Sequence, residues 1–400
     1  MRPLEGYTVV DLTTYVAAPV CARLLSDLGA RVIKIESPKG DGWRNTGVIF
    51  GPRRFTQEEN PIFDLYNSGK DMICLNLKSP EGMEAMHKLL AKADVFITNN
   101  RPAALSRLGL HYDQLKEKYP RLIYGIVLGF GEKGPDADKP AFDTTAFWSR
   151  SGFLRDTAVV GEREYYPVEA PSGVGDSYTG TNLAMQVMAA VLHRQQTGKG
   201  QYIKSSLFHI GAFAMGTMIL KGQRPWGVQM PAPRWDARPT NGAFQCADGD
   251  WIFLSGVTPA QLYKFAGQPE KMQDPIWDPA KLEETKKERY QAIAELMRSR
   301  TLPEWMASIE PLGTPTVRMS HFADLAEDEQ AWANGYVEHV LYPNGNADVV
   351  PATPLDMSCM ERPKTQATRR LGQNTEKVLA ELGYTAEEIE KMAAAGSVIC

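Results

Sequence analysis

The sequence is poor in cysteine, and it has neither a long apolar run nor an excess of positive charge. Its five cysteines are scattered, without a CxxC pair, so neither a disulfide framework nor a structural zinc site is expected. No apolar stretch approaches the roughly 20 residues that span a bilayer, and the opening MRPLEGYTVVDL lacks the form of a signal peptide. The 44 Lys and Arg against 48 Asp and Glu leave no basic field for nucleic acid or anionic lipid. We therefore expect a cytoplasmic protein that binds neither nucleic acid nor membrane.

The motifs of several common enzyme classes are also absent. The turn TTYVAAP after the first predicted strand has no G-x-G-x-x-G, although pyrophosphate binding there needs glycine for close backbone approach. A P-loop and a G-x-S-x-G elbow are missing as well. The six histidines never occur at i, i+3 or i, i+4 spacing, so no metal is expected.

Short β-branched segments alternate with amphipathic helical stretches in the first half of the chain. Strands are predicted at Tyr7–Leu12 and Arg31–Glu36, with a helix at Ala18–Leu28 between them, which has the length of a βαβ crossover. The alternation continues with strands at Met72–Leu77, Asp94–Thr98 and Leu122–Leu128 and with helices at Pro80–Ala93 and Ala103–Leu108. This order predicts an α/β fold with a Rossmann-like parallel sheet.

The pattern changes after residue 220. A long apolar helix is predicted at Thr179–Arg194, and residues 222–242 are rich in Gly, Pro, Trp and Arg, as in a connector. The later predicted elements are a strand at Asp250–Ser255 and helices at Lys281–Arg298, Pro303–Glu310 and Asn374–Leu382. We expect a large α/β domain at 1–220, completed by 345–400, and a linker with a smaller α+β domain at 221–344.

One local feature carries a candidate for chemistry. The segment GVGDSYTG, residues 173–180, places Asp176 between glycines at the start of the long helix. The structural interpretation is an N-cap, in which the carboxylate accepts a free backbone N–H and complements the helix dipole. The functional interpretation is a nucleophile, because the glycines permit close approach of a ligand and helix-start amides would face an oxyanion.

Several motifs, in order, resemble those of the class III CoA-transferase family. They are VVDLTTYVAAPVCARLLSDLGARVIKIESPKGD, YNSGKDMICLNLKSPEG, ITNNRPAALSRLGL, GFGEKGP, GDSYTG, TGKGQ and, near the end, GQNTEKVLAEL. The stretches ENPIFDLYNS, LKEKYPRLIYG, FDTTAFWSRSGFLRD and PVEAPSGVGD are most similar to the 2-hydroxyisocaproate and phenyllactate CoA-transferases of amino-acid-fermenting anaerobes. The resemblance runs from Leu4 to about Leu220 and resumes at Gly372–Leu382.

The resemblance implies a specific chemistry. Asp176 would be the nucleophile that attacks an acyl-CoA and then carries CoA as an aspartyl thioester, before a 2-hydroxycarboxylate takes the CoA over. This chemistry suits a carboxylate that is ionised at pH 7, and it needs no metal or tightly bound cofactor, since CoA thioesters and carboxylic acids are the substrates. The resemblance also implies an interlocked homodimer.

The CoA contacts implied by the resemblance lie at the ends of the predicted strands. They are Val16, Ala17, Leu75, Lys78, Asn99, Asn100, Arg101 and Arg107. Taken singly, each charged residue is as well explained as a solvated surface charge. Some relatives have an arginine near the adenine where this chain has Ser37, and Lys39 and Arg44 are the nearest replacements. The glycine-rich lid of the relatives aligns with LSGVT, where this chain has only Gly256.

Two alternatives remain open. Acyl-CoA racemases share the fold, but they carry a histidine base where this sequence has Phe142, and a phenyl ring cannot exchange a proton. A catalytically silent CoA-binding protein is the other alternative. The aromatic residues Phe142, Phe147, Trp148 and Phe153 precede Asp176; core packing is the interpretation we favour, and an acyl pocket for a bulky apolar acid is the second.

Overall fold

The computed structural model describes residues 1–44, 55–160, 165–223, 230–368 and 370–400. These residues form two units. The first unit contains Met1–Phe153, Glu169–Ile219 and Asp328–Cys400, and the second contains Leu154–Val168 and Leu220–Glu327. That the predicted segments, 1–220 with 345–400 and 221–344, are separate folding domains stays a prediction.

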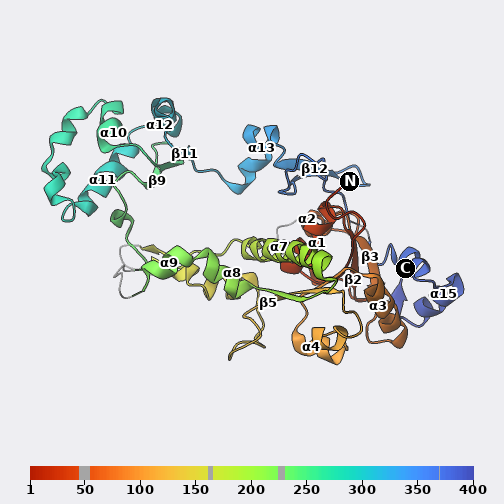
Figure 1. The fold of residues 1–400 in the computed structure, drawn as a ribbon. Helices are drawn as coiled ribbons and strands as arrows, with labels where there is room; N and C mark the ends of the chain where they lie inside the picture. The colour runs from red at the N-terminus through yellow and green to blue at the C-terminus, as the bar shows by residue number, and fades with distance from the viewer. Residues whose placement is uncertain (45–54, 161–164, 224–229, 369) are drawn as a thin grey trace. The chain divides into compact units, whose positions relative to one another are not determined.

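A seven-stranded sheet lies at the centre of the first unit (Figure 1). Its strand order is β14-β3-β2-β1-β4-β5-β8, and neighbouring strands are parallel except β14, which runs antiparallel to β3. The strands are β1 (Thr8–Leu12), β2 (Arg31–Glu36), β3 (Asp71–Leu75), β4 (Val95–Thr98), β5 (Ile123–Leu128), β8 (Tyr202–Ser206) and β14 (Val398–Ile399). The predicted α/β fold with a parallel sheet is therefore confirmed.

Helices cover both faces of this sheet, which is why its strands read as nearly continuous apolar runs. The helices of the first unit are α1 (Ala17–Asp27), α2 (Pro61–Asn67), α3 (Pro80–Lys92), α4 (Pro102–Arg107), α5 (Tyr112–Leu115), α7 (Val174–Thr197), α8 (Leu207–Ala214), α13 (Glu329–Ala333), α14 (Thr375–Glu381) and α15 (Ala386–Ala394), with a π-helix at Asp143–Ser149. Val9 packs in one core with Leu25 of α1 and Leu183 of α7. The next residue, Val10, packs in the other core with Leu89 of α3. Alternate residues of β1 therefore stabilise opposite layers.

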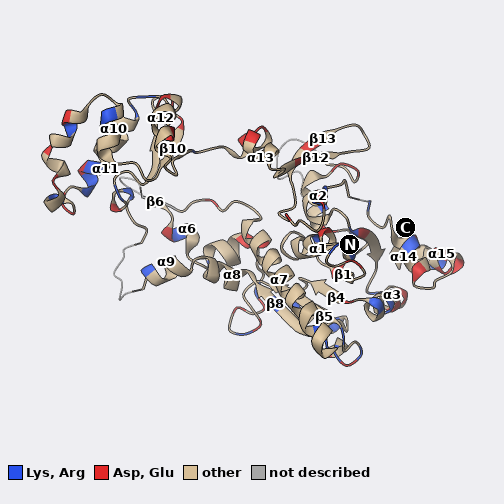
Figure 2. Cartoon of the chain, turned by 45° about the horizontal axis from the view of Figure 1, so that its top comes forward, with Lys and Arg blue, Asp and Glu red and all other residues tan. Residues whose placement is uncertain are grey.

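The long helix α7 begins earlier than the sequence predicts. It has 24 residues and starts at Val174, not at Thr179, so Asp176 lies in its first turn. Its only Asp, Glu, Lys or Arg residues are Asp176 and Arg194, near its two ends (Figure 2). Glycine lets α7 lie against α1, because a Cβ on Gly180 would collide with the backbone oxygen of Ala17.

The C-terminal segment completes the edge of the sheet beside β3. β14 pairs with β3 through Val398 and Leu75. The Asn374 side chain accepts a hydrogen bond from the backbone N–H of Met72 (2.9 Å), and the Thr375 hydroxyl accepts one from the N–H of Cys74 (3.0 Å). The predicted helix at the C-terminus exists as α14, but the sequence pattern did not predict β14.

The second unit has a small antiparallel sheet of order β11-β10-β9. Its strands are β9 (Gly242–Gln245), β10 (Trp251–Leu254) and β11 (Val317–Arg318), and its main helices are α10 (Pro259–Phe265), α11 (Lys286–Met297) and α12 (Leu302–Ile309). Ile252, Ile293 and Trp305 are buried in its core. The chain passes from one unit to the other within two short helices, α6 (Phe153–Asp156) and α9 (Gly216–Lys221). The second unit also contains the antiparallel pair β6 (Val159–Val160) and β7 (Tyr165–Tyr166). The first unit contains the antiparallel pair β12 (Val337–Leu341) and β13 (Ala347–Pro351). Across the described ranges, no helix is both long and apolar enough to cross a membrane.

Candidate active site

Asp176 is the third residue of α7 and is half-buried. The residue at the N-cap position is Gly173, whose φ of 84° lies in the left-handed region that favours glycine. The interpretation of Asp176 as the N-cap is therefore wrong, since the cap position lies three residues earlier. Its carboxylate remains a candidate for chemistry.

A different carboxylate caps the helix from a distant segment. Asp143, the first residue of the π-helix, accepts a hydrogen bond from the backbone N–H of Gly173 (2.9 Å). A Cβ on Gly175 would collide with Oδ1 of Asp143 and with the ring of Phe147. The glycine is therefore needed because the helix start, Asp143 and Phe147 are packed against one another.

The two carboxylates raise the proton affinity of the site. Burial, and then the negative charge of Asp143, raise the pKa of Asp176 to about 7. Burial also raises the pKa of Asp143, against the hydrogen bond that its carboxylate accepts from the backbone of Gly173. A pKa of about 7 favours the protonated form of Asp176 more than an ordinary aspartate would, whereas the sequence led us to expect an ionised carboxylate at pH 7.

A cavity of about 360 Å³ lies beside the start of α7. Ser177 and Thr181 of α7, Tyr66 of α2 and Thr353 contribute its hydroxyl groups. Its other lining residues are mostly apolar: Val20, Leu24, Leu65, Pro351, Ala352 and Pro354, with Arg23 and Asp27 at one side. The sequence analysis did not single out Tyr66, because nothing in the local pattern brings residue 66 to residue 176.

A second cavity, of about 270 Å³, lies at the carboxyl ends of β1 to β4. Of the predicted CoA contacts, Leu75, Lys78 and Asn100 line it, together with Thr14 and Ser37. It is located where the strand order changes direction, between β1 and β4. Open α/β sheets bind ligands in such a crevice.

The remaining predicted contacts are divided between the protein interior and its surface. Asn99 is bound to the β1–α1 turn, since its Oδ1 accepts from the N–H of Thr14 (3.0 Å) and its Nδ2 donates to the Thr14 oxygen (2.8 Å). Val16 and Ala17 are buried at the start of α1. Arg101 and Arg107 are exposed at the two ends of α4.

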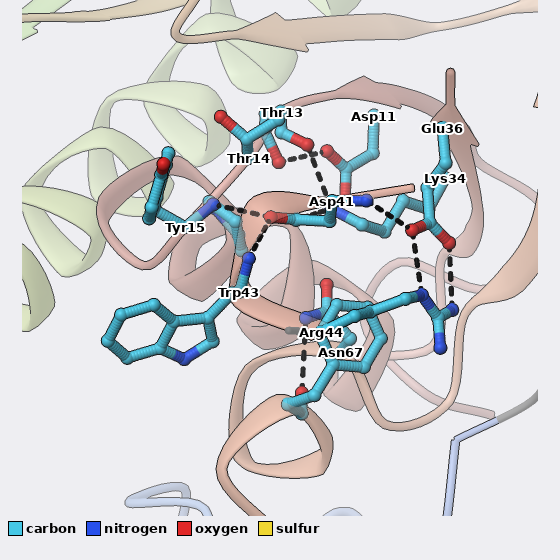
Figure 3. A network of polar contacts seen from close by, with 12 residues as sticks. Asp11, Thr13, Thr14, Tyr15, Lys34, Glu36, Asp41, Trp43, Arg44 and Asn67 are labelled. Atoms are coloured by element: carbon cyan, nitrogen blue, oxygen red, sulfur yellow. Dashed lines mark hydrogen bonds and ion pairs between the residues drawn. The ribbon is translucent and has the colours of Figure 1, made fainter. Parts of the chain in front are cut away.

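A buried network of charges fixes the turn between β1 and α1 (Figure 3). Lys34 pairs with Asp41 (3.0 Å) and donates to the backbone oxygen of Thr13 (2.9 Å). Asp41 in turn accepts from the N–H of Tyr15 (3.0 Å), whose φ of 64° is unusual for a residue other than glycine. The carboxylate thus stabilises a strained turn at the edge of the carboxyl-end cavity.

Asp11 and Lys70 complete the network in the interior. Their side chains are fully buried and lie 2.8 Å apart. Burial alone would raise the pKa of Asp11, but Lys70 and Lys34 hold it below its ordinary value. Burial lowers the pKa of Lys70 to about 8. The sequence contains a signal for these buried ion pairs, because Asp11 and Lys34 are charged residues within otherwise apolar strands.

Similarity to known proteins identifies the family of this chain. The sequence profile of CoA-transferase family III matches residues 4–375. The chain belongs to this family. The chain is 39% identical to (R)-2-hydroxy-4-methylpentanoate CoA-transferase of Clostridioides difficile, over 96% of this chain and 97% of that one. Its identity to cinnamoyl-CoA:phenyllactate CoA-transferase of Clostridium sporogenes is 36%, over 97% and 95% of the two chains. A solved CAIB/BAIF family protein from Brucella suis has a TM-score of 0.81 at 27% identity, over 95% and 99% of the two chains.

The aromatic residues of this CoA-transferase have different environments. Phe147 and Trp148 are buried, as the packing interpretation predicts. Phe142 is 60% exposed and meets Tyr15 edge-on, with ring centroids 5.8 Å apart. Phe153 is half-buried and packs edge-on against Trp148. Phe142, which stands where the racemases carry a histidine base, thus presents an exposed phenyl ring.

Lys39 and Arg44, the two suggested replacements for the arginine near the adenine, differ in whether other protein groups already bind them. Arg44 makes two hydrogen bonds to Glu36 (2.7 and 2.8 Å) and lies over the ring of Phe63. Lys39 is exposed near Ser37, which lines the carboxyl-end cavity. Arg44 is therefore held by protein partners, which leaves Lys39 as the better candidate for an adenine or phosphate contact.

Gly256 lies in the second unit, between β10 and α10, with a φ of 77°. A Cβ there would meet Thr314 and Pro315 at 3.4 Å. These values describe a tight turn, and a role as a lid stays a prediction. Among the residues that the structure describes, no group of three or more His, Cys, Asp or Glu could hold a metal.

Proposed function

We propose that this CoA-transferase moves CoA reversibly between an acyl- or enoyl-CoA and a 2-hydroxycarboxylate, with Asp176 as the nucleophile. The observation that carries the proposal is a half-buried carboxylate in the first turn of α7, flanked by glycine at 175 and next to a cavity. The names of the two relatives above, which act on 2-hydroxy-4-methylpentanoate and phenyllactate, support the substrate class. The proposed setting is amino-acid fermentation in the cytoplasm.

The proposed reaction exchanges groups without a net change of protons or electrons. The ionised Asp176 attacks the carbonyl carbon of the acyl-CoA, the C–S bond breaks, and CoA leaves as the thiolate. The thiolate then attacks the Asp176 carbonyl of the mixed anhydride, which releases the donor carboxylate and leaves an aspartyl-CoA thioester. The acceptor carboxylate repeats both steps in reverse and restores Asp176.

We propose that CoA binds along the carboxyl edge of the sheet. The β1–α1 turn supports this, because Thr14 lines the edge cavity and Cγ1 of Val16 lies 3.9 Å from the position of a Cβ on Gly173. One short turn therefore extends from the edge cavity to the helix of Asp176. The exposed Lys78, Arg101 and Arg107 are proposed partners of the CoA phosphates.

The acceptor is proposed to be bulky and apolar. The cavity beside α7 offers hydroxyl groups, one of them on Ser177, the residue after Asp176, and an otherwise largely apolar lining. Such a lining favours a branched or aromatic side chain over a second carboxylate, as in oxalate. Racemisation is the second candidate, and it predicts uptake of solvent deuterium at the α-carbon of an acyl-CoA without any acceptor acid.

A homodimer is proposed from the resemblance and from the surface of α7. Val174, Tyr178, Met185, Met188 and Leu192 are exposed along this helix, and Met185 and Leu192 are 56% and 61% exposed. A patch of this kind in an otherwise polar surface is typical of an interface. The proposed occupant is a second copy of the chain.

The function is tested by CoA exchange and by trapping of the intermediate. A panel of carboxylic acids, including 2-hydroxyisocaproate, phenyllactate and oxalate, is assayed with several acyl-CoA donors. Hydroxylamine or borohydride quenching after incubation with acyl-CoA should modify Asp176, as read by peptide mass. Asp113→Asn, at an exposed carboxylate on α5, is the matched control for Asp176→Ala. Transfer that survives Asp176→Ala would refute the mechanism, and a preference for oxalate would refute the substrate class.

A further inference from the structure

The hydroxyl of Tyr66 lies against the start of the helix that carries Asp176. Its oxygen is 3.2 Å from the position that a Cβ on Gly173 would occupy. Asp176 and Asp143 are the charged groups that act on it. Tyr66 also lines the cavity beside α7, with Ser177 and Thr181. The phenol therefore lies both at this cavity and against the start of the helix that carries the candidate nucleophile.

Two other donors at this place already have a partner, since the Thr181 hydroxyl donates to the backbone oxygen of Ser177 (2.8 Å) and the N–H of Gly173 is also bonded. The N–H of Gly173 donates to Oδ2 of Asp143 (2.9 Å). Of the helix-start amides that the sequence led us to expect at an oxyanion, that of Gly173 is thus directed at Asp143. By contrast, none of the hydrogen bonds among the described residues uses the Tyr66 hydroxyl.

Tyr66 keeps its proton under physiological conditions. Burial, and then the charges of Asp176 and Asp143, raise the pKa of Tyr66 to about 12. The hydroxyl is therefore neutral and remains a hydrogen-bond donor around pH 7.

The helix that carries Tyr66 is held in place from both ends. The Asn60 side chain caps α2 by accepting from the N–H of Phe63 (3.0 Å), and it donates to the backbone oxygen of Arg44 (3.0 Å). At the other end, Oδ1 of Asn67 accepts from Nζ of Lys70 (3.0 Å), within the buried charge network. A donor on such a support loses little free energy of reorganisation when charge develops beside it.

We propose that Tyr66 is a catalytic residue whose hydroxyl donates a hydrogen bond to the oxyanion formed when a carbonyl at Asp176 is attacked. The inference rests on the proposed function and names the donor that its tetrahedral intermediates need. No bond to Tyr66 forms or breaks, and its proton stays on the phenol. The donor acts on the acyl carbonyl in the first step and on the Asp176 carbonyl in the second, because both carbonyl carbons are bonded to the same carboxylate oxygen in the anhydride.

The test is Tyr66→Phe, which keeps the ring and removes only the hydroxyl. We expect kcat for CoA transfer to fall about 100-fold, with KM for both substrates changed less than about threefold. The hydroxylamine-trapped Asp176 adduct should form about 100-fold more slowly in a single turnover. Tyr112→Phe, which removes a phenol from α5, is the matched control and should retain the wild-type kcat.

Each outcome decides between the inference and the proposed function. A folded Tyr66→Phe enzyme with kcat within twofold of wild type refutes the role of Tyr66. An increase in KM alone also refutes it, because it would show a contact made equally in the ground state. If Asp176→Ala abolishes transfer in either case, the proposed function stands without Tyr66; if Asp176→Ala transfers CoA normally, the proposed function itself fails. Thermal unfolding of each variant separates loss of fold from loss of chemistry.

Discussion

Asp143 accepts a hydrogen bond from Gly173, the N-cap residue of the helix whose first turn carries Asp176. One carboxylate therefore orients the backbone that carries the other. The hydrogen bond from the N–H of Gly173 to Asp143 is 2.9 Å long. This arrangement has two effects on Asp176. It occupies the backbone N–H of Gly173, and it adds a negative charge that disfavours ionisation of Asp176.

The pH dependence of the enzyme should follow from this pair. Asp176 has a pKa of about 7 and acts in its ionised form, so kcat/KM should rise with pH through about 7. In Asp143→Asn the amide oxygen can still accept from Gly173, but the negative charge is gone. We expect the acidic limb of the kcat/KM profile to move to lower pH, because the pKa of Asp176 falls. Asp113→Asn should leave the limb in place, and an unmoved limb in Asp143→Asn would contradict the coupling.

The free energy of unfolding should depend on pH through Asp176, and the raised pKa sets the direction of that dependence. Its pKa rises from 3.8 in the unfolded chain to about 7 in the folded protein, so ionisation opposes folding above pH 7, by at most about 4 kcal/mol. The cost decreases as pH falls from about 7 and disappears below about 3.8, where both states are protonated. Asp176→Asn should therefore raise the free energy of unfolding at pH 8 and have little effect at pH 4. Denaturant unfolding at the two pH values measures this, and an equal effect at both would contradict the raised pKa.

Gly175 should tolerate no side chain. A Cβ there would collide with Asp143 and Phe147, so Gly175→Ala should lower the free energy of unfolding by about 1–3 kcal/mol and reduce kcat by displacing the cap. Gly216→Ala is the matched control, since nothing lies within 4 Å of a Cβ at that position in α9. Thermal denaturation and CoA transfer of the two variants check the prediction. A Gly175→Ala enzyme as stable and active as Gly216→Ala would refute the packing argument.

How far the sequence predicts this structure depends on whether a pattern is local. The βαβ unit from Tyr7 to Glu36 was predictable because strands buried on both faces need continuous apolar runs. The first turn of α7 was not, since glycines at 173 and 175 read as a loop. Gly173 is favoured by its positive φ, and Gly175 is required by Asp143 and Phe147, which lie some thirty residues earlier in the chain. Tyr66 was not predicted for a similar reason, because tertiary packing brings it to the site and no residue spacing in the sequence indicates this.

The buried charges show a second limit. Asp11 and Lys34 were visible as charges within apolar strands, which should have predicted a buried pair. Their actual partners, Lys70 and Asp41, follow from where β2 and β3 align with β1, and sequence reasoning does not fix that register.

Breaking this network should be costly. Lys34→Met leaves Asp41 and Asp11 buried without one of their cations, so the free energy of unfolding should fall by about 3–5 kcal/mol. The turn that Asp41 holds lies at the carboxyl-end cavity, so KM for the acyl-CoA should also rise. Arg31→Met removes two exposed pairs, to Asp71 and to Glu381, and should cost at most about 1 kcal/mol for each. Urea denaturation of both variants checks the difference, and similar midpoints would show that the buried pairs do not stabilise the fold.

The exposed face of α7 should be required for assembly. In the double variant Met185→Lys and Met188→Lys, two cations would be desolvated in any interface that covers this helix, and we expect dimer dissociation to increase at least about tenfold. Ala394→Lys, at an exposed position on α15, is the control and should leave the assembly unchanged. Analytical ultracentrifugation at low micromolar concentration measures the effect. A double variant with the same dissociation constant as wild type would show that α7 faces solvent in the assembled enzyme, and the apolar residues along it would then need another explanation.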